Sequence, residues 1–431
     1  MAEGIATEAP RLRDPSERAG ARSRRWSWRQ GVGAAWIVAI PVFLLYALWL
    51  FAYDGPGHDP RDAVALGRHF VQQSHASTVI KLDPAYRYPD GDIGYDGQFA
   101  YFIALDPVNA RYYTDAPTYR YSRILYPLLA RGLAIGQARL IPYTLLLINF
   151  VAIVGGTLLA ALWLRRKGVW PWFALVYGLY PGLFLAFQRD TTEVLAYGLV
   201  ALGVYLLDFG GRHRILLGAV AFSMAVLTRE TTAVFPVLYG LGLVVGGLSS
   251  HDSVERRSRR TSGGLVIGVA VLPFLLYKVF LLVWLGAHGD PGLLLERVPF
   301  LGVFETEQTT GWVEGIRTVL VPGLICLATG LFVARRHPRV PEPWILVANA
   351  VLFVVLLHRS SWVDISASAR VTVGVVLAAI LCLPLFTRVL GSRAWFWVCG
   401  ALWLSLVPFW ILMPELKYLI YVSVPLRHPH L

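Results

Sequence analysis

A carboxylate set between two glycines is the first feature of this sequence that could carry chemistry. Asp96 lies between Gly94 and Gly97, immediately before the aromatic and apolar stretch 99–104. A turn at these glycines would present the carboxylate at the edge of a hydrophobic segment, which we expect to be a membrane surface. Asp-Gly is also ordinary turn chemistry, so a purely structural role stays open.

A second group of polar residues interrupts an apolar region at 188–193, in the order Gln-Arg-Asp-Thr-Thr-Glu, and includes Arg189. Asp190 and Glu193 stand three residues apart, which would put both on one face at the start of a helix. A helix cap explains the same pattern, with Asp190 and Thr191 as caps and Glu193 completing a capping box. Ionisable groups near the centre of a membrane helix cost roughly 2.5–3.5 kcal/mol, so they usually mark a functional site. The two interpretations are compatible.

Arginines near the apolar runs are the third feature. Arg229 and Glu230 join two such runs almost without a loop. Adjacent helical residues do not face each other, so each should find a partner on another helix, such as Asp190 or a phosphate for Arg229. The forked donors of arginine suit phosphate, whereas Lys278 is explained almost as well by snorkelling. The further cations expected on the same side of the membrane are Arg120, Arg123, Arg370 and Lys278.

Several other kinds of chemistry are disfavoured. No P-loop, glycine-rich dinucleotide turn, zinc-protease motif or nucleophile elbow occurs in a credible setting, which disfavours soluble-nucleotide chemistry. The three cysteines each sit inside an apolar run, without the spacing of a disulfide framework or a metal site. A carboxylate, several arginines and an apolar surround suit a substrate with a phosphate head and a lipid tail.

The elements that position these residues must be membrane helices. The chain of 431 residues is 56% hydrophobic and only 15% charged, which excludes a soluble fold. Its net charge of +12 comes from basic residues beside hydrophobic runs, not from a stripe with interleaved aromatics, so nucleic acid is not an expected partner. A bilayer core of roughly 30 Å needs about 20 apolar residues per helix. Eleven candidate runs fall at 32–52, 143–164, 169–187, 191–208, 213–228, 231–248, 264–285, 317–334, 343–357, 370–390 and 394–413.

The breaks between these runs alternate in charge, which predicts the orientation of the chain. Arginines precede the first run and basic residues follow the second, and the positive-inside rule puts both in the cytoplasm, together with the N-terminus. The same alternation leaves almost every carboxylate of the membrane domain outside. The predicted cytoplasmic breaks are 22–29, 165–167, 212–214, 256–260, 335–336 and 388–393.

The longest outer segment, 53–142, is where we expect a site, since ordered loops of this length are usually functional. Its later part, 122–141, combines leucines and isoleucines with arginines, a pattern that fits an amphipathic helix in the interface. The competing interpretation is a twelfth, poorly formed span. We predict a disordered basic cytoplasmic tail over 1–31, a transmembrane domain over 32–415 in the cell inner membrane, and a short tail over 416–431.

With these residues in view, the chain resembles the GT-C integral membrane glycosyltransferases, which take a sugar from a polyprenyl-phosphate donor on the extracytoplasmic face. The strongest likeness is to bacterial relatives of the glycosylphosphatidylinositol mannosyltransferase II family. It is carried by Gly-Tyr-Asp-Gly-Gln-Phe-x-Tyr at 94–101 and by the aromatic-proline run at 119–129. Later landmarks at 180–182, 192–193 and 227–231 follow in the same order, so the likeness covers about the first half of the chain. Tyr95 stands where the eukaryotic members carry Trp, which leaves the acceptor open.

The resemblance implies an all-α GT-C-like fold and an inverting transfer from a polyprenyl-phosphate-linked sugar, with mannose among the candidates, to an extracytoplasmic glycan or glycolipid. Asp96 would deprotonate the acceptor hydroxyl, and Asp54, directly after the first run, is the alternative base. Cations would stabilise the leaving phosphate. No metal or cofactor is required, although Asp54, Asp92 and Asp96 could bind a divalent ion. The substrate-binding residues expected on this basis are Tyr95, Gln98, Arg120, Arg123, Arg189, Asp190, Glu193, Arg229, Glu230, Lys278 and Arg370.

Two functions of other classes stay open. A transporter or flippase of lipid-linked saccharides would also have many helices and intramembrane charges. It should show internal repeats and broken helices near the midplane, and the sequence has no convincing repeat. A non-catalytic subunit of an envelope assembly is the third alternative.

Overall fold

The computed structural model describes residues 28–53, 59–73, 88, 91–249, 251–287, 295–305, 310–362 and 365–407. These residues are mostly helical, and the single extended pairing among them is a bridge between Leu295 and Leu357. The prediction of an all-α fold is confirmed for the described residues. The alternative base Asp54, the C-terminal tail and nearly all of the N-terminal tail lie outside the described residues.

Apolar helices of membrane-spanning length recur along the described chain. Five are long enough by themselves, and a sixth is obtained if two helices bent by 111° against each other count as one broken span. By length and composition the described helices could cross a membrane five or six times, as expected of a multi-pass membrane protein, whereas the predicted count of eleven spans is not confirmed. The five helices are Ala138–Arg166, Glu230–Leu248, Ser253–Leu285, Trp312–Arg336 and Val373–Leu390, and shorter apolar helices occupy Ala35–Phe51, Pro341–Val355 and Ala394–Leu404.

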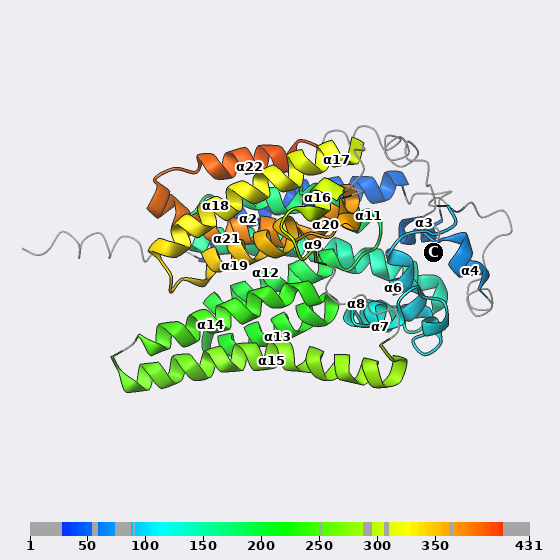
Figure 1. Ribbon diagram of the computed structural model, residues 1–431, viewed down its shortest axis with the longest axis horizontal. Helices are drawn as coiled ribbons and strands as arrows, with labels where there is room; N and C mark the ends of the chain where they lie inside the picture. Colours follow the sequence, from blue (N-terminus) through cyan, green and yellow to red (C-terminus); the bar gives the residue numbers. More distant parts are fainter. Residues whose placement is uncertain are drawn as a thin grey trace, which may run out of the picture.

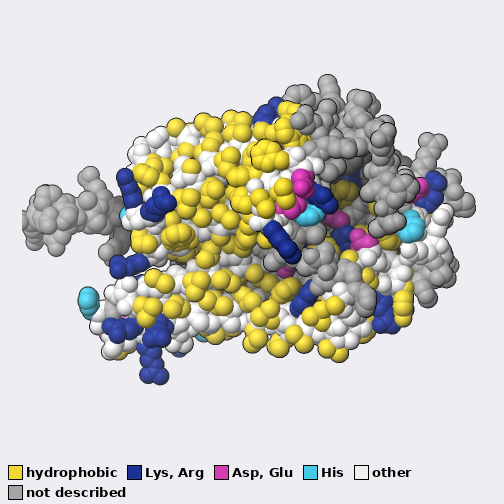
Figure 2. Space-filling model, viewed as in Figure 1, with side chains coloured by type: hydrophobic (Ala, Val, Ile, Leu, Met, Phe, Trp, Pro, Cys, Tyr) yellow, Lys and Arg dark blue, Asp and Glu magenta, His cyan; other side chains and the backbone are white. Residues whose placement is uncertain are grey.

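The long helices lie roughly side by side in two groups, with α9 and α12 between them (Figure 1). In one group, α15 packs against both α13 and α14, and α12 packs against α13. The other group contains α18, α19, α21 and α22, and the central helix α9 contacts both α2 and α12. Hydrophobic side chains dominate the flank of the molecule in Figure 2, which suits contact with lipid. The bounds are α2 (Trp28–Tyr53), α9 (Ile141–Arg166), α12 (Glu193–Phe209), α13 (Arg214–Thr228), α14 (Val234–Leu248), α15 (Ser253–Leu285), α18 (Val321–Arg336), α19 (Pro341–Ala350), α21 (Val373–Leu390) and α22 (Ala394–Leu404).

The third apolar run, 169–187, does not form the predicted single span. Prolines stand at the first position of two of its three pieces, where the missing N–H is tolerated but the preceding residue leaves the helical conformation. A Cβ atom at Gly182 would lie 2.2 Å from the carbonyl oxygen of Ala369, so glycine lets the last piece lie directly against α20 (Ile365–Val371). This contact fixes the position of Arg370. The three pieces are η3 (Pro171–Ala174), α10 (Leu175–Gly178) and α11 (Pro181–Gln188).

The segment between α2 and α9 forms short helices at one end of the bundle (Figure 1). Its helix α8 has nine residues, a length of about 14 Å, so the interpretation as a twelfth span is wrong. Tyr126 and Ala130 are buried, whereas Leu128 and Leu133 are exposed. This two-sided pattern agrees with an interfacial helix, and its position in a membrane stays a prediction. The short helices here are α3 (Arg61–Val64), α4 (Arg68–Gln72), α6 (Gly97–Leu105), η1 (Ala110–Tyr112), α7 (Pro117–Tyr121), α8 (Leu125–Leu133) and η2 (Ala138–Leu140).

Further short elements connect or extend the long helices. Two π-helical segments adjoin α18 and α19, and π-helical turns are frequent at functional sites. The remaining elements are η4 (Gly211–His213), η5 (Glu230–Ala233), α16 (Leu301–Glu305), α17 (Thr310–Gly315), η6 (Ile316–Leu320), η7 (Val351–Val355) and η8 (Arg359–Ser361).

Candidate active site

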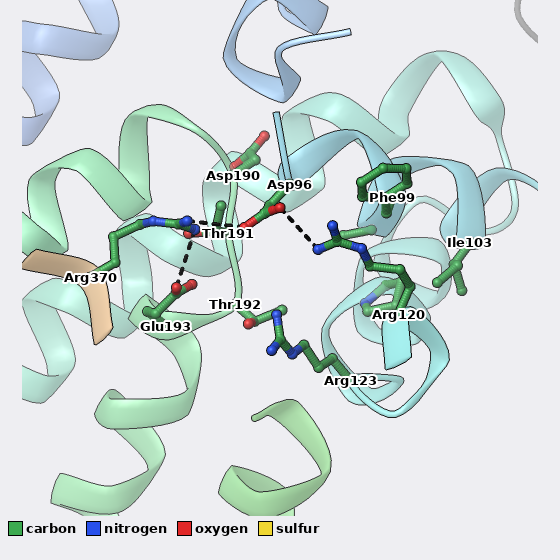
Figure 3. A pocket seen from close by; sticks show the side chains of 12 residues that line it. Asp96, Phe99, Ile103, Arg120, Arg123, Asp190, Thr191, Thr192, Glu193 and Arg370 are labelled. Atoms are coloured by element: carbon green, nitrogen blue, oxygen red, sulfur yellow. Dashed lines mark hydrogen bonds and ion pairs between the residues drawn. The ribbon is translucent and has the colours of Figure 1, made fainter. Parts of the chain in front are cut away.

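A pocket with charged and apolar walls lies where the first loop meets the ends of the long helices (Figure 3). Its cavity volume is about 20 Å³, room for about one water molecule between the charged side chains. Residues of α6, α7 and α20 and of the 190–193 turn contribute to its lining, so segments far apart in the sequence meet here. The predicted site residues that line it are Asp96, Arg120, Arg123, Asp190, Glu193 and Arg370.

Asp96 is positioned by a tightly packed turn at the start of α6. Gly94 has a φ of +69°, in the left-handed region that favours glycine. A Cβ atom at Gly97 would lie 2.0 Å from the carbonyl oxygen of Arg189, so only glycine allows this approach to the 190–193 turn. The amide of Gln98 stabilises the turn, since its Oε1 accepts from the Gly67 N–H at 3.0 Å and its Nε2 donates to the Ile93 carbonyl at 2.8 Å. Gln98 therefore shapes the turn and does not line the pocket.

Both carboxylate oxygens of Asp96 accept hydrogen bonds from arginines. Nη1 of Arg120 donates to Oδ1 at 3.0 Å, and Nη2 of Arg370 donates to Oδ2 at 3.0 Å (Figure 3). Burial by itself would raise the pKa of Asp96, but the charges of Arg120 and Arg370, with a contribution from Arg123, outweigh it and bring the pKa well below its usual range. Asp96 is therefore ionised in this arrangement.

Arg120 is fixed by a second carboxylate. Its Nε and Nη2 donate to the two oxygens of Asp115 at 2.7 Å each, a bidentate pair, and its guanidinium lies over the ring of Phe99 at 4.2 Å from the centroid. The neighbouring charges of Asp96 and Asp115 raise the pKa of Arg120 despite its burial, which favours the neutral form. Arg120 thus bridges Asp96 and Asp115 as a permanent cation.

Arg370, the other arginine that binds Asp96, is also held by a second carboxylate, that of Glu193. Its Nη1 lies 3.2 Å from Oε1 of Glu193, and Nη1 of Arg229 lies 3.0 Å from the same oxygen. The guanidinium of Arg370 also lies over the ring of Tyr95 at 4.8 Å, and that of Arg189 lies at 5.4 Å from the same ring. The ring of Tyr95 therefore lies close to two predicted site arginines, although Tyr95 is not itself part of the pocket lining.

Arg229 and Glu230 pair with different segments, as predicted, but Arg123, the partner of Glu230, lies in the turn between α7 and α8 and not on a helix, and the partner of Arg229 also differs. Arg229 pairs with Glu193, not with Asp190. Glu230 accepts two bonds from Arg123, at 3.2 Å from Nε and 2.9 Å from Nη2, and Nη2 of Arg123 also donates to the hydroxyl of Tyr119. Arg123 thus has a carboxylate partner of its own while lining the pocket.

Asp190 and Glu193 do not share a helical face, which corrects the prediction from their spacing. Asp190 has a φ of +48° and precedes α12, which begins at Glu193. The capping interpretation is also wrong, because the N-cap is Thr192 and no side chain caps the helix. Backbone at positive φ is strained for a residue other than glycine, and such strain is common at functional sites.

Asp190 is fully buried and belongs to a polar network with neutral side chains. The hydroxyl of Tyr126 lies 3.2 Å from Oδ1 of Asp190, and Nδ2 of Asn149 donates to that hydroxyl at 2.7 Å and to the Thr191 carbonyl at 3.2 Å. Asn149 lies inside the apolar helix α9, so it ties the 190–193 turn to a membrane-spanning element.

Several predicted residues do not line the pocket, and one cannot be placed. Those that lie next to lining residues are Tyr95, Gln98, Arg189, Arg229 and Glu230. Lys278 is within α15 and does not line the pocket, so snorkelling explains it better. Asp92 is largely exposed and lies 3.7 Å from Arg68. Among the described residues, no three His, Cys, Asp or Glu side chains are grouped so that they could hold a metal ion, and the oxygens of Asp96 face arginines. Asp54 is outside the described residues.

Sequence reasoning missed three residues that support the site, namely Asp115, Tyr126 and Asn149. Asn149 carried a usable signal, because an amide within an apolar run usually finds a specific partner. Asp115 carried none, since an aspartate in a polar loop is ordinary.

No family model, curated protein or solved structure matches this chain. The likeness to GT-C enzymes therefore rests on the residues of the sequence.

Proposed function

We propose that this protein is a membrane glycosyltransferase that moves a sugar from a polyprenyl-phosphate donor to a hydroxyl of a glycan or glycolipid. The observation that carries the proposal is the position of Asp96 between Arg120 and Arg370, in a pocket that Arg123 also lines. Guanidinium groups bind phosphate through paired donors, and a carboxylate next to them is placed to accept a proton from an attacking hydroxyl.

In the proposed reaction, the acceptor oxygen attacks the anomeric carbon of the donor sugar from the side opposite the phosphate. As this C–O bond forms, the acceptor hydroxyl passes its proton to Asp96. The bond between the anomeric carbon and the phosphate oxygen breaks, and its electron pair leaves with polyprenyl phosphate, so the configuration inverts. The arginines stabilise the negative charge that develops on the departing phosphate.

The ion pairs of Asp96 set a condition on this chemistry. A carboxylate whose two oxygens accept from guanidinium groups is a weak base. A donor phosphate would compete with Asp96 for Arg120 and Arg370 and would add negative charge beside it. Both changes raise the proton affinity of a carboxylate, so donor binding would prepare Asp96 to act as the base.

The other carboxylates of the site would keep the arginines in place during this exchange. Each of the three pocket arginines pairs with a carboxylate other than Asp96. These contacts do not depend on Asp96, so the guanidinium groups are preorganised for a phosphate that replaces it. The pairs are Arg120 with Asp115, Arg123 with Glu230 and Arg370 with Glu193.

The membrane would supply the donor and orient the reaction. We propose that the pocket end of the bundle is extracytoplasmic, in the cell inner membrane, with eleven spans and a cytoplasmic N-terminus. Basic side chains gather at the opposite end in Figure 2, where the α14–α15 connection lies in Figure 1. This distribution supports the orientation through the positive-inside rule.

The test is transfer by purified protein reconstituted with a panel of polyprenyl-phosphate sugars, mannose first, and with envelope glycan or glycolipid acceptors. Asp96→Asn should lower the rate by roughly 10²–10⁴-fold, the range typical of general-base catalysis, while the protein still inserts and folds. The matched control is Asp92→Asn, an exposed carboxylate of the same loop, which should keep full activity. Full activity in the Asp96→Asn protein would remove Asp96 as the base.

Mass spectrometry of envelope glycans and lipid-linked sugars from cells without the gene complements this assay. A missing sugar with accumulated donor on the extracytoplasmic side supports a transferase. Donor trapped on the cytoplasmic side, with every glycosyl transfer intact in broken membranes, would instead indicate a flippase.

A further inference from the structure

A second and larger cavity lies at the other end of the bundle. It has a volume of about 570 Å³ and opens between α12, α13, α14, α15 and the start of α19. Ligand sites typically have volumes of roughly 300–1,000 Å³. Leu207 and Asp208 near the end of α12 line this cavity, whereas Glu193 at the beginning of α12 lines the Asp96 pocket. The two sites are therefore about 20 Å apart along that helix.

The charges in this second cavity are only partly neutralised by one another. Lys167 lies 2.7 Å from Asp208, which also accepts from the Trp163 indole at 2.8 Å, and Arg259 lies 2.7 Å from Glu255. Three further ionisable side chains, two exposed arginines and one partly buried glutamate, line the cavity and have no ion-pair partner in the part of the chain that the structure describes. They are Arg214, Arg339 and Glu342.

A buried hydroxyl in the same cavity also lacks a partner. Tyr239 is 8% exposed, and its Oη makes no hydrogen bond to any described residue. A buried hydroxyl without a hydrogen bond is destabilising, so such a group calls for a partner that the described residues do not supply. A polar ligand in the cavity would satisfy it.

We propose that this cavity binds the headgroup of a phospholipid that carries both a phosphate and an amine, namely phosphoethanolamine. The phosphate would contact Arg214 and Arg339, and the ammonium group would donate to Glu342 and to the Tyr239 hydroxyl. A headgroup with both signs matches the two cations and one carboxylate that lack partners, whereas a purely anionic one would leave Glu342 unmatched. Basic pockets between membrane helices are known lipid-headgroup sites.

The surroundings of the cavity suit the rest of such a lipid. Gly242 and Gly246 of α14 line it, and the adjacent side chains of Leu241 and Val245 are exposed. These apolar side chains give the acyl chains a surface that continues from the cavity along the outside of α14. A soluble phosphoethanolamine would not use this surface.

The proposal is tested by native mass spectrometry of the full-length protein in detergent, with dioleoylphosphatidylethanolamine or dioleoylphosphatidylglycerol added at equal concentration. We expect the ethanolamine lipid to stay bound preferentially. The double variant Arg214→Gln/Arg339→Gln should weaken its binding at least about tenfold, as expected for lost charged contacts. Glu342→Gln should remove the preference between the two lipids, and Tyr239→Phe should weaken the ethanolamine lipid alone.

The matched control is Arg335→Gln/Arg336→Gln, which removes two arginines from the end of α18 that do not line the cavity. This variant should bind as the unaltered protein does. Equal binding of the two lipids by the unaltered protein, or an equal loss in the control variant, would overturn the proposal. Equally tight binding of soluble O-phosphoethanolamine would overturn the assignment to a lipid. Because none of these measurements involves sugar transfer, the result is independent of the proposed function.

Discussion

Oδ2 of Asp96 and Nη2 of Arg370 lie 3.0 Å apart, although 274 residues separate them in the chain. Asp96 belongs to the first loop and Arg370 to α20, a short helix near the end of the described chain. Their contact depends on Gly97, which admits the backbone of Arg189, and on Gly182, which admits the backbone of Ala369. The ion pair therefore forms only when the first loop and α20 are both packed against the segment 181–190 that lies between them in the sequence.

Replacing Arg370 should separate phosphate binding from general structure. Arg370→Gln removes one of the guanidinium groups proposed to take the donor phosphate, and a charged hydrogen bond is worth about 1.5–3 kcal/mol, so donor affinity should fall roughly 10- to 100-fold. Arg370→Lys keeps the charge but not the paired donors and should recover only part of the loss. Binding of a fluorescent polyprenyl-phosphate sugar to the reconstituted protein measures both effects. Unchanged affinity in the Gln variant would exclude Arg370 from the phosphate site.

Arg229 provides the contrasting case. It pairs with Glu193 but does not line the pocket, so its role should be structural. Arg229→Gln leaves the buried Glu193 with Arg370 as its partner but removes one charged contact, which should lower the free energy of unfolding by about 1.5–3 kcal/mol. Donor affinity should change by less than about twofold, since Arg370 still pairs with Glu193. Denaturation in detergent and the same donor-binding assay test the two halves of this expectation. A large loss of affinity at unchanged stability would make Arg229 a direct phosphate ligand.

Much of the candidate site could be predicted because charged residues are conspicuous in an apolar chain. Asp96, Arg120, Arg123 and Arg370 are predicted from residue type and position, and all four line one pocket. The pairing of the charges could not be predicted in the same way. Asp190 leaves the helical register through its positive φ, and Arg229 then meets Glu193 instead. Such choices depend on tertiary packing, which local spacing does not encode.

The fold shows the same division between local and tertiary information. Apolar runs predict where helices occur, but hydrophobicity alone does not reveal where a helix breaks. Pro181 and the contact of Gly182 with Ala369 divide one predicted span into short pieces. The count of eleven spans therefore stays a prediction supported by charge alternation.

The ion pairs of Asp96 should make stability depend on acid. The pKa of Asp96 in the folded protein lies below its ordinary value, so its pairs stabilise the fold above that ordinary value, about pH 4, and this contribution is lost as the pH falls through the folded pKa. Asp96→Asn should be less stable than the unaltered protein at neutral pH, and the difference should shrink as the pH falls below about 4. Denaturation in detergent at a series of pH values measures this difference. If the difference in stability between the two proteins stayed constant down to the lowest pH, Asp96 would not be ionised in these ion pairs.

A single methyl group at Gly97 should damage both stability and activity. The added Cβ would lie 2.0 Å from the Arg189 carbonyl oxygen, and backbone on both sides leaves little room to move. Overpacking of this kind typically costs about 1–3 kcal/mol, and the shift would carry Asp96 away from Arg120 and Arg370. Gly132→Ala is the matched control, because nothing lies within 4 Å of its added Cβ in α8, and it should leave transfer unchanged and raise stability by about 0.5–1 kcal/mol. We expect Gly97→Ala to lose transfer at temperatures where it remains folded. Full transfer by that variant would show that the turn does not determine the position of the base.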